Sequence, residues 1–129
     1  MTIAYIDTSA CGKLLVEESH SVALAAFVNA LDEDSLVASQ LLETELRRMA
    51  TRKALPQQAV TEVLSGISMV LPERDFFHRA GLLPGRHLRS LDALHLITAM
   101  DAEVDTVLTY DHRLMEAAES IGLSSVSPT

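Results

Sequence analysis

The sequence has little cysteine and few aromatic residues, and it contains no long uninterrupted apolar run. Cys11 is the only cysteine among 129 residues, which excludes an internal disulfide and a cysteine-based metal cage. No apolar segment approaches the roughly 20 residues that a membrane-spanning helix needs. The first residues lack Lys and Arg, and Asp7 interrupts their apolar run, so we expect no signal peptide and a cytoplasmic protein.

Glycine is also scarce and scattered. The 5 glycines form neither a phosphate-binding loop nor a dinucleotide-binding fingerprint, which argues against nucleotide-dependent enzymes. Hydrophobic residues make up 48% and charged residues 22% of the chain, values typical of a folded globular protein. We expect one domain over residues 1–129, because this length is the commonest size of a single domain.

Short apolar segments alternate with longer helical patterns, which indicates βαβ units and a parallel sheet. Right-handed crossovers then place helices on both faces of the sheet, and ligands bind beyond the carboxyl ends of the strands. The expected strands cover residues 3–6, 35–39, 67–71, 106–110 and 124–126. The expected helices begin near residue 8, cover about 21–31 and 40–54, open again at Pro56, and cover 72–83, 90–102 and 112–121.

Two acidic residues directly follow expected strands. Asp7 closes the first strand and Asp111 closes the fourth, so both side chains are expected at the carboxyl edge of the sheet. Each is also well placed as a helix cap, for which Asp is a preferred residue. Two acids at equivalent strand ends nevertheless favour a shared site.

A third acid lies in the first turn of the helix over 90–102. The apolar residues of this helix cover most of its circumference, so we expect it to be largely buried. Asp92 and His95 share the remaining polar strip. A buried carboxylate needs a partner or a metal ion, and His95 is either a positioning residue for Asp92 or the substrate, or a hydrogen-bonded core histidine.

A fourth acid is expected within the apolar stripe of the helix over 40–54. Rotation at 100° per residue places Glu45 on the stripe, whereas Glu43 projects roughly opposite, near Arg47. Ionised carboxylates are rarely buried without a partner. Glu45 is therefore the preferred site residue, and Glu43 is the alternative. The structural explanation is a Glu45 side chain that extends to the rim of the core or pairs with an arginine.

Four carboxylates from separate segments would repel one another in one crevice unless a cation joins them. Oxygen ligands without nearby cysteine favour Mg²⁺ or Mn²⁺ over zinc. Such a site suits hydrolysis of a phosphodiester bond, because the metal activates water and neutralises charge on the phosphate.

The net charge of −8 argues against a nucleic-acid partner only if the distribution of charge is ignored. The metal would cancel part of the negative charge, and two local basic groups remain available to phosphates. These groups are Arg47, Arg48, Arg52 and Lys53, and then Arg86, His87 and Arg89.

The order and spacing of these motifs resemble those of the PIN-domain ribonucleases, and specifically the VapC-type toxins of bacterial toxin–antitoxin pairs. The likeness covers essentially the whole chain, and the motifs are specific only in combination. The matching segments are Ile6-Asp7-Thr8-Ser9, Ser39 with Thr44-Glu45-Leu46-Arg47, Leu91-Asp92-Ala93-Leu94-His95-Leu96, and Thr109-Tyr110-Asp111-His112-Arg113-Leu114.

This resemblance implies a three-layer α/β/α sandwich with a central parallel sheet and an Mg²⁺- or Mn²⁺-dependent endoribonuclease that cuts structured RNA such as tRNA or rRNA. It also implies a homodimer and a cognate VapB-type antitoxin. The implied catalytic and metal-binding acids are Asp7, Glu45, Asp92 and Asp111. Thr8, Ser9 and Thr109 are the implied supporting residues, and Arg47, Arg48, Arg86, Arg89 and Arg113 are candidate contacts to RNA or the antitoxin.

Two other classes of protein share some of these features. A phosphoacceptor signalling module also has an Asp at a strand end, but it pairs acids after the first strand and uses a late lysine, whereas the lysines here are Lys13 and Lys53. A non-catalytic domain that binds RNA or a protein partner would use the acids only as caps. Cys11 is expected to pack in the core.

Overall fold

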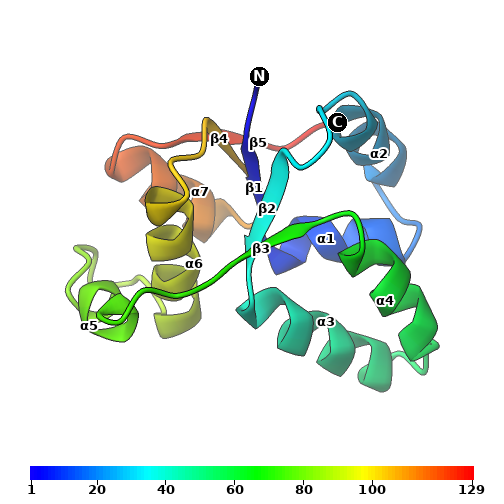
Figure 1. Cartoon of the computed structure of the whole chain (residues 1–129), viewed down its shortest axis with the longest axis horizontal. Helices are drawn as coiled ribbons and strands as arrows, with labels where there is room; N and C mark the ends of the chain where they lie inside the picture. Colours follow the sequence, from blue (N-terminus) through cyan, green and yellow to red (C-terminus); the bar gives the residue numbers. More distant parts are fainter.

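A five-stranded, all-parallel sheet organises the chain, and the computed structural model describes all residues from 1 to 129 (Figure 1). The strand order is β3-β2-β1-β4-β5. The strands are β1 (Ala4–Ile6), β2 (Leu36–Ser39), β3 (Ser68–Val70), β4 (Thr106–Leu108) and β5 (Ser124–Val126). The helices are α1 (Thr8–Leu15), α2 (Ser21–Asn29), α3 (Leu41–Arg52), α4 (Gln57–Leu64), α5 (Phe76–Gly81), α6 (Ser90–Asp101) and α7 (His112–Ser120).

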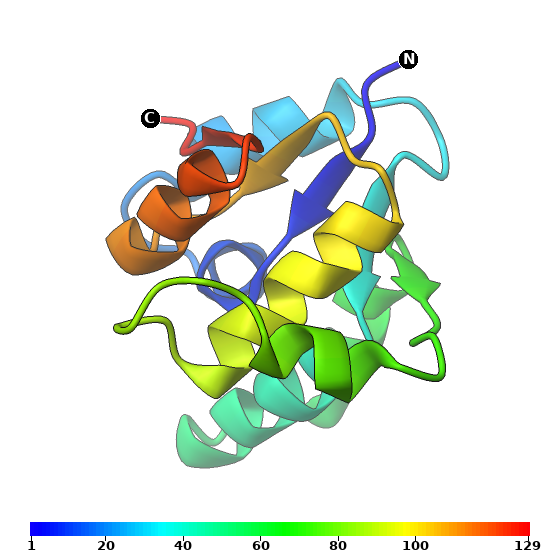
Figure 2. The same ribbon diagram turned by 90° about the vertical axis from the view of Figure 1, so that its left-hand side faces the viewer.

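The helices form two layers, one on each side of the sheet. Helices α1 to α4 lie on one side and α5 to α7 on the other (Figure 1), and the view turned by 90° shows α6 and α7 in front of the strands (Figure 2). This arrangement confirms the three-layer α/β/α sandwich expected from the sequence. None of the helices is long and apolar enough to cross a membrane.

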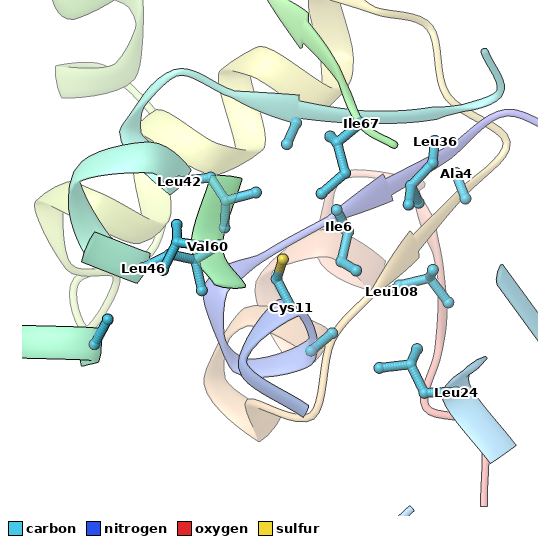
Figure 3. Close-up of a cluster of buried hydrophobic side chains, with 13 residues drawn as sticks. Ala4, Ile6, Cys11, Leu24, Leu36, Leu42, Leu46, Val60, Ile67 and Leu108 are labelled. Carbon is cyan, nitrogen blue, oxygen red and sulfur yellow. The ribbon is translucent and has the colours of Figure 1, made fainter. Parts of the chain in front are cut away.

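Alternation along β1 divides the core between the two layers. Ala4 and Ile6 belong to the cluster beneath α1 to α4, whereas Tyr5 belongs to the cluster beneath α6 and α7, as expected for a strand whose successive side chains point to opposite faces. Figure 3 shows Cys11 and Ile6 within the first cluster. Burial raises the pKa of Cys11 to about 12, so this thiol packs as a small apolar group, as the sequence predicts.

Helix α6 is less buried than its apolar composition predicts. Leu91 is 49% exposed and Met100 is 40% exposed. Only the middle of the helix is covered: Leu96 packs in the cluster on the sheet, and Ile97 packs with residues of α5. The apolar residues at the two ends therefore extend beyond the partners that would cover them.

The remaining differences concern the ends of elements. The expected helix over 72–83 is reduced to α5, because residues 72–74 form an extended and turning segment before it. Pro56 is the N-cap residue of α4 and lies just outside its first turn. The other expected strands and helices are present with bounds shifted by a few residues, which is the usual uncertainty at frayed ends.

Candidate active site

The carboxyl ends of β1 and β4 are neighbours in the sheet, because the chain reverses the direction of winding between these strands. Asp7 follows β1 directly, and Thr109 and Asp111 follow β4. Crevices at such a reversal point are the usual ligand sites of open parallel sheets.

A cavity of about 340 Å³ opens at this edge. It combines residues from the end of β1, from α3, from the start of α6 and from the segment after β4, so it brings the four predicted acids together. Its lining residues are Asp7, Thr8, Ser9, Glu45, Arg89, Ser90, Leu91, Asp92, His95 and Asp111.

Asp7 is the most enclosed of the four acids, with 5% of its surface exposed. Its Oδ1 accepts hydrogen bonds from the Ala10 backbone N–H at 3.0 Å and from the Ser9 hydroxyl at 2.8 Å. Its Oδ2 accepts from the Thr109 hydroxyl at 2.7 Å. Burial raises the pKa of Asp7, although hydrogen bonds from Thr109, Ala10 and Ser9 oppose that rise. Asp7 therefore caps α1 and also presents a carboxylate to the cavity.

Asp111 has the corresponding position at the start of α7. Its Oδ1 accepts a hydrogen bond from the Arg113 backbone N–H at 2.9 Å, and its own N–H donates to Thr109 Oγ1 at 3.0 Å. The Ser9 hydroxyl lies 3.2 Å from the same oxygen of Thr109. Ser9 and Thr109 thus link the segments that carry Asp7 and Asp111. The same hydrogen bonds that make these two acids helix caps also hold them at the cavity.

Glu45 reaches the cavity from α3 and is held by a histidine from α6. Glu45 Oε1 lies 2.8 Å from His95 Nε2, and the side chain of Glu45 is 25% exposed. Burial alone would raise the pKa of Glu45, but the hydrogen bond with His95 holds it below its ordinary value. His95 therefore hydrogen-bonds Glu45. One of the alternatives from the sequence had expected it to position Asp92 instead.

The other nitrogen of His95 faces the core. His95 Nδ1 hydrogen-bonds the hydroxyl of Tyr5, and that hydroxyl also accepts from the Ser39 backbone N–H at 3.3 Å. Burial raises the pKa of Tyr5 well above its ordinary value, so the phenol keeps its proton. Sequence reasoning missed Tyr5, although its position two residues before Asp7 on the same strand face was the available signal.

Asp92 lies half-buried at the start of α6 with one oxygen unsatisfied. Asp92 Oδ2 is buried and has no hydrogen-bond partner. Thr8 lines the same cavity, and its side chain helps to lower the pKa of Glu45. Burial raises the pKa of Asp92, and the negative charge of Asp111 raises it further. Buried oxygens without donors and mutually repelling carboxylates are the conditions that a bound cation relieves.

The donor set fits a hard divalent cation better than a soft one. No three His, Cys, Asp or Glu side chains are arranged closely enough to enclose a metal ion on their own. Mg²⁺ does not need such an enclosure, because it usually keeps several waters and takes only one or two carboxylates together with substrate phosphate. The unsatisfied Asp92 Oδ2 therefore fits an open Mg²⁺ or Mn²⁺ site and does not fit a closed structural zinc site.

Several charged residues near these motifs lie outside the cavity. Glu43 pairs with Arg47 at 2.9 Å on the exposed face of α3. The Arg47 guanidinium also donates to Gln57 Oε1 at 3.1 Å, which joins α3 to α4. Asp101 pairs with Arg79 at 2.7 Å at the far end of α6. Of the two glutamates considered on α3, only Glu45 lines the cavity.

Three arginines line the cavity or its neighbour. Arg89 lines the carboxylate cavity, and Arg86 and Arg113 line an adjoining cavity of about 310 Å³ between the segment before α6 and helix α7. None of these three guanidinium groups forms an ion pair with a carboxylate. The charge of Arg113 also acts on Asp92, so the positive and negative regions are contiguous.

The fold and this cavity place an acidic site at the carboxyl edge of a parallel sheet, and comparison with known proteins identifies the family. Residues 4–120 match the PIN domain family. The chain is 38% identical over 130 residues to Ribonuclease VapC35 of Mycobacterium tuberculosis, with 96% of each chain covered. It is 32% identical over 132 residues to Ribonuclease VapC46 of the same organism, with 100% of each covered. The chain belongs to the PIN-domain family, in its VapC-type branch.

Solved structures share the fold at low sequence identity. The crystal structure of Mycobacterium tuberculosis VapC20, described as a toxin that cleaves the sarcin-ricin loop, has a TM-score of 0.76 and 14% identity, with 97% of this chain and 99% of that chain covered. The structure of VapBC2 from Rickettsia felis bound to a promoter DNA fragment has a TM-score of 0.74 and 15% identity, with 99% and 100% covered.

Proposed function

We propose that this chain is an endoribonuclease that acts as the toxin of a toxin–antitoxin pair. The observation that carries the proposal is the cavity that gathers Asp7, Glu45, Asp92 and Asp111 at the carboxyl edge of a PIN-domain sheet. Sequence relatives that cover 96% and 100% of the chain are ribonucleases by name, and VapC20 is described as a toxin that cleaves the sarcin-ricin loop. Hydrolysis of an RNA phosphodiester bond is the reaction that this set of acids suits.

The four acids would hold Mg²⁺ or Mn²⁺, with Thr8, Ser9 and Thr109 as supporting residues. When bound, such an ion lowers the pKa of coordinated water and neutralises the charge that develops on the phosphate. Asp7 is held rigidly by donors from Ser9, Ala10 and Thr109, so it offers a fixed oxygen. Asp92 contributes the buried oxygen that has no donor.

The unpaired arginines would bind the RNA backbone. Arg89, Arg86 and Arg113 extend from the carboxylate cavity into the adjoining one, as a strand crossing the site would require. Phosphate contacts of this kind position the substrate without reading its sequence. Arg47 is already bound by residues of α3 and α4, so we do not assign it to the RNA backbone. Arg47 and the neighbouring Arg48 are instead the proposed contacts to the antitoxin.

A VapB-type antitoxin is the proposed protein partner, because the solved neighbours of this fold include VapBC complexes from Rickettsia felis and Haemophilus influenzae. We also propose a homodimer, as the family resemblance implies. Since ribosomal or transfer RNA and the antitoxin would both be met in the cytoplasm, we expect the protein to act there.

The test is cleavage of a total-RNA pool by the purified, antitoxin-free chain with Mg²⁺, with Mn²⁺ and with chelator. Wild type should cut in a metal-dependent manner, and Asp92→Asn should not. Asp32→Asn is the matched control, because Asp32 is an exposed acid at the opposite edge of the sheet. Hydrolysis by activated water leaves 5′-phosphate and 3′-hydroxyl ends. A 2′,3′-cyclic phosphate product would contradict this chemistry, because the 2′-hydroxyl would then be the nucleophile.

A further inference from the structure

A buried phenol lies directly behind the acidic cavity. Tyr5 is fully buried on the sheet face beneath α6, in a cluster whose other buried members are aliphatic. A polar group in such a place must be hydrogen-bonded to be tolerated. Its hydroxyl has two partners, the backbone N–H of Ser39 and Nδ1 of His95.

These two partners determine where the protons lie. The Ser39 N–H can only donate, so it uses the Tyr5 oxygen as an acceptor. The hydroxyl proton then has only His95 Nδ1 as an acceptor. In the opposite arrangement, with a proton on Nδ1, the Tyr5 O–H would be a buried donor without an acceptor. Tyr5 therefore selects the imidazole tautomer that carries its proton on Nε2.

That tautomer directs a donor at the acidic site. His95 Nε2 lies 2.8 Å from Glu45 Oε1, so Nε2–H donates to the carboxylate. His95 is itself buried, with 5% of its side chain exposed, and it cannot swing away without breaking both hydrogen bonds. One oxygen of Glu45 is thereby fixed across the gap between α6 and α3.

We propose that Tyr5 and His95 are positioning residues that hold the Glu45 carboxylate in place for a divalent cation. The Tyr5–His95–Glu45 relay runs from β1 through α6 to α3, and it rests on the proposed function only in assigning Glu45 to the metal. Groups that hydrogen-bond a metal ligand orient it and set its basicity, which is why their loss weakens metal binding.

The spacing of the relay explains how it reaches the site. Tyr5 precedes Asp7 by two residues and shares its side of β1, and His95 follows Asp92 by three residues on α6. Glu45 is carried by a helix of the opposite layer and has a long side chain with free rotation about several bonds. Of the four acids it gains most from an external anchor, because Asp7 and Asp111 are already fixed as helix caps.

The tautomer is measurable without metal, RNA or mutation. Nitrogen-15 NMR of the metal-free chain, labelled at histidine, distinguishes protonated from unprotonated ring nitrogens. We expect the neutral imidazole of His95 to show a bare Nδ1 and a protonated Nε2. A neutral imidazole with its proton on Nδ1 overturns the proposal. In Tyr5→Phe the nitrogen-15 shift of Nδ1 should change, because that nitrogen loses the hydroxyl that donates to it.

Metal binding tests the consequence. By calorimetry with Mn²⁺ alone, Tyr5→Phe should weaken the affinity about tenfold, and excess Mn²⁺ should restore part of the RNA cleavage. Tyr110→Phe is the matched control, because it also removes a phenol hydrogen bond, here to the Pro128 carbonyl at 2.6 Å. Unchanged Mn²⁺ affinity in Tyr5→Phe overturns the relay, and so does an equal loss in Tyr110→Phe.

A double-mutant cycle separates positioning from packing. His95→Gln supplies an amide donor that does not depend on Tyr5, so adding Tyr5→Phe to it should cause no further loss of Mn²⁺ affinity. An additive loss overturns the relay. If the tautomer and the Mn²⁺ affinities behave as expected but wild type cuts no RNA, the relay stands and the proposed function fails. If wild type cuts RNA and Tyr5→Phe binds Mn²⁺ as wild type does, the proposed function stands and the relay fails.

Discussion

The hydroxyl of Thr109 donates a hydrogen bond of 2.7 Å to Asp7, a residue 102 positions earlier in the sequence. This contact ties the end of β4 to the end of β1, and Thr109 also accepts from the backbone N–H of Asp111 at 3.0 Å. One fully buried hydroxyl therefore connects two of the four acids. A site assembled in this way depends on the pairing of β1 with β4.

Replacement of that hydroxyl should affect both the stability and the pH dependence of cleavage. In Thr109→Val, Asp7 and the Asp111 N–H each lose a partner, and we expect a loss of about 1–3 kcal/mol in the free energy of unfolding. Burial already raises the pKa of Asp7, and Thr109 is the strongest influence that opposes it. The acidic limb of the pH–rate profile should therefore move to higher pH. Denaturant unfolding and a pH series of cleavage rates would measure both effects.

Thr106→Val is the control for this substitution. Thr106 is a buried threonine three residues earlier on β4, but its hydroxyl contacts only the carbonyl and the hydroxyl of Ser124, each at 3.4 Å and away from the cavity. It should leave the pH profile unchanged. An equal shift of the profile in both variants would show that the strand, and not the Asp7 contact, is responsible.

The charge on Asp92 should destabilise the metal-free fold at neutral pH. Burial, aided by the charge of Asp111, raises the pKa of Asp92, so the folded chain holds this proton more tightly than the unfolded chain does. The resulting stabilisation is complete below the ordinary pKa and is lost as the pH rises through the raised value. Asp92→Asn should therefore melt about 1–3 °C above wild type at neutral pH without metal, a small shift because the group is partly solvated.

Melting curves from pH 4 to pH 8 would check the sign. The difference between Asp92→Asn and wild type should shrink as the pH falls, because wild-type Asp92 then takes up its proton. Addition of Mg²⁺ should raise the melting temperature of wild type and have less effect on the variant. A variant that melts below wild type at neutral pH would mean that Asp92 is satisfied without a cation.

The sequence predicts the sheet and the positions of the four acids well, because both follow from local rules. Asp7 and Asp111 each follow a strand and cap a helix, and a capping acid at a strand end is visible in the residue order alone. Rotation about the helix axis is sufficient to separate Glu45, which lines the cavity, from Glu43, which pairs with Arg47. These predictions need no knowledge of contacts between distant segments.

The partner of His95 could not be predicted in the same way. Periodicity places His95 beside Asp92, yet its hydrogen bonds go to Tyr5 and Glu45 on other elements. Which side chains meet across helices depends on the packing of three layers, which no local pattern encodes. The exposed Leu91 has the same cause, since composition does not reveal where a neighbouring element ends.

Asp101 should prove dispensable for cleavage, whereas Asp111 should not. Asp101 forms a two-pronged pair with Arg79, at 2.8 and 2.7 Å, and so joins α6 to α5. Asp101→Asn should lower the melting temperature slightly. That decrease should be smaller at high salt, because the ion pair is partly exposed. The cleavage rate should stay at the wild-type value. Asp111→Asn should slow cleavage at least tenfold. Equal rates in the two variants would remove Asp111 from the site.

The arginines beside the cavity should account for the salt dependence of RNA binding. Arg113 and Arg86 carry no ion pair within the chain, so each is free to displace a counterion from a phosphate. Replacing either by Ala should lower the slope of log affinity against log salt by about 0.7 on single-stranded RNA, and similarly for all sequences. Arg52→Ala, at the far end of α3, should leave the slope at the wild-type value. Binding measured by fluorescence anisotropy on cleavage-deficient Asp92→Asn would show this directly, and a slope that responds to Arg52 but not to Arg113 would place the RNA along α3 instead.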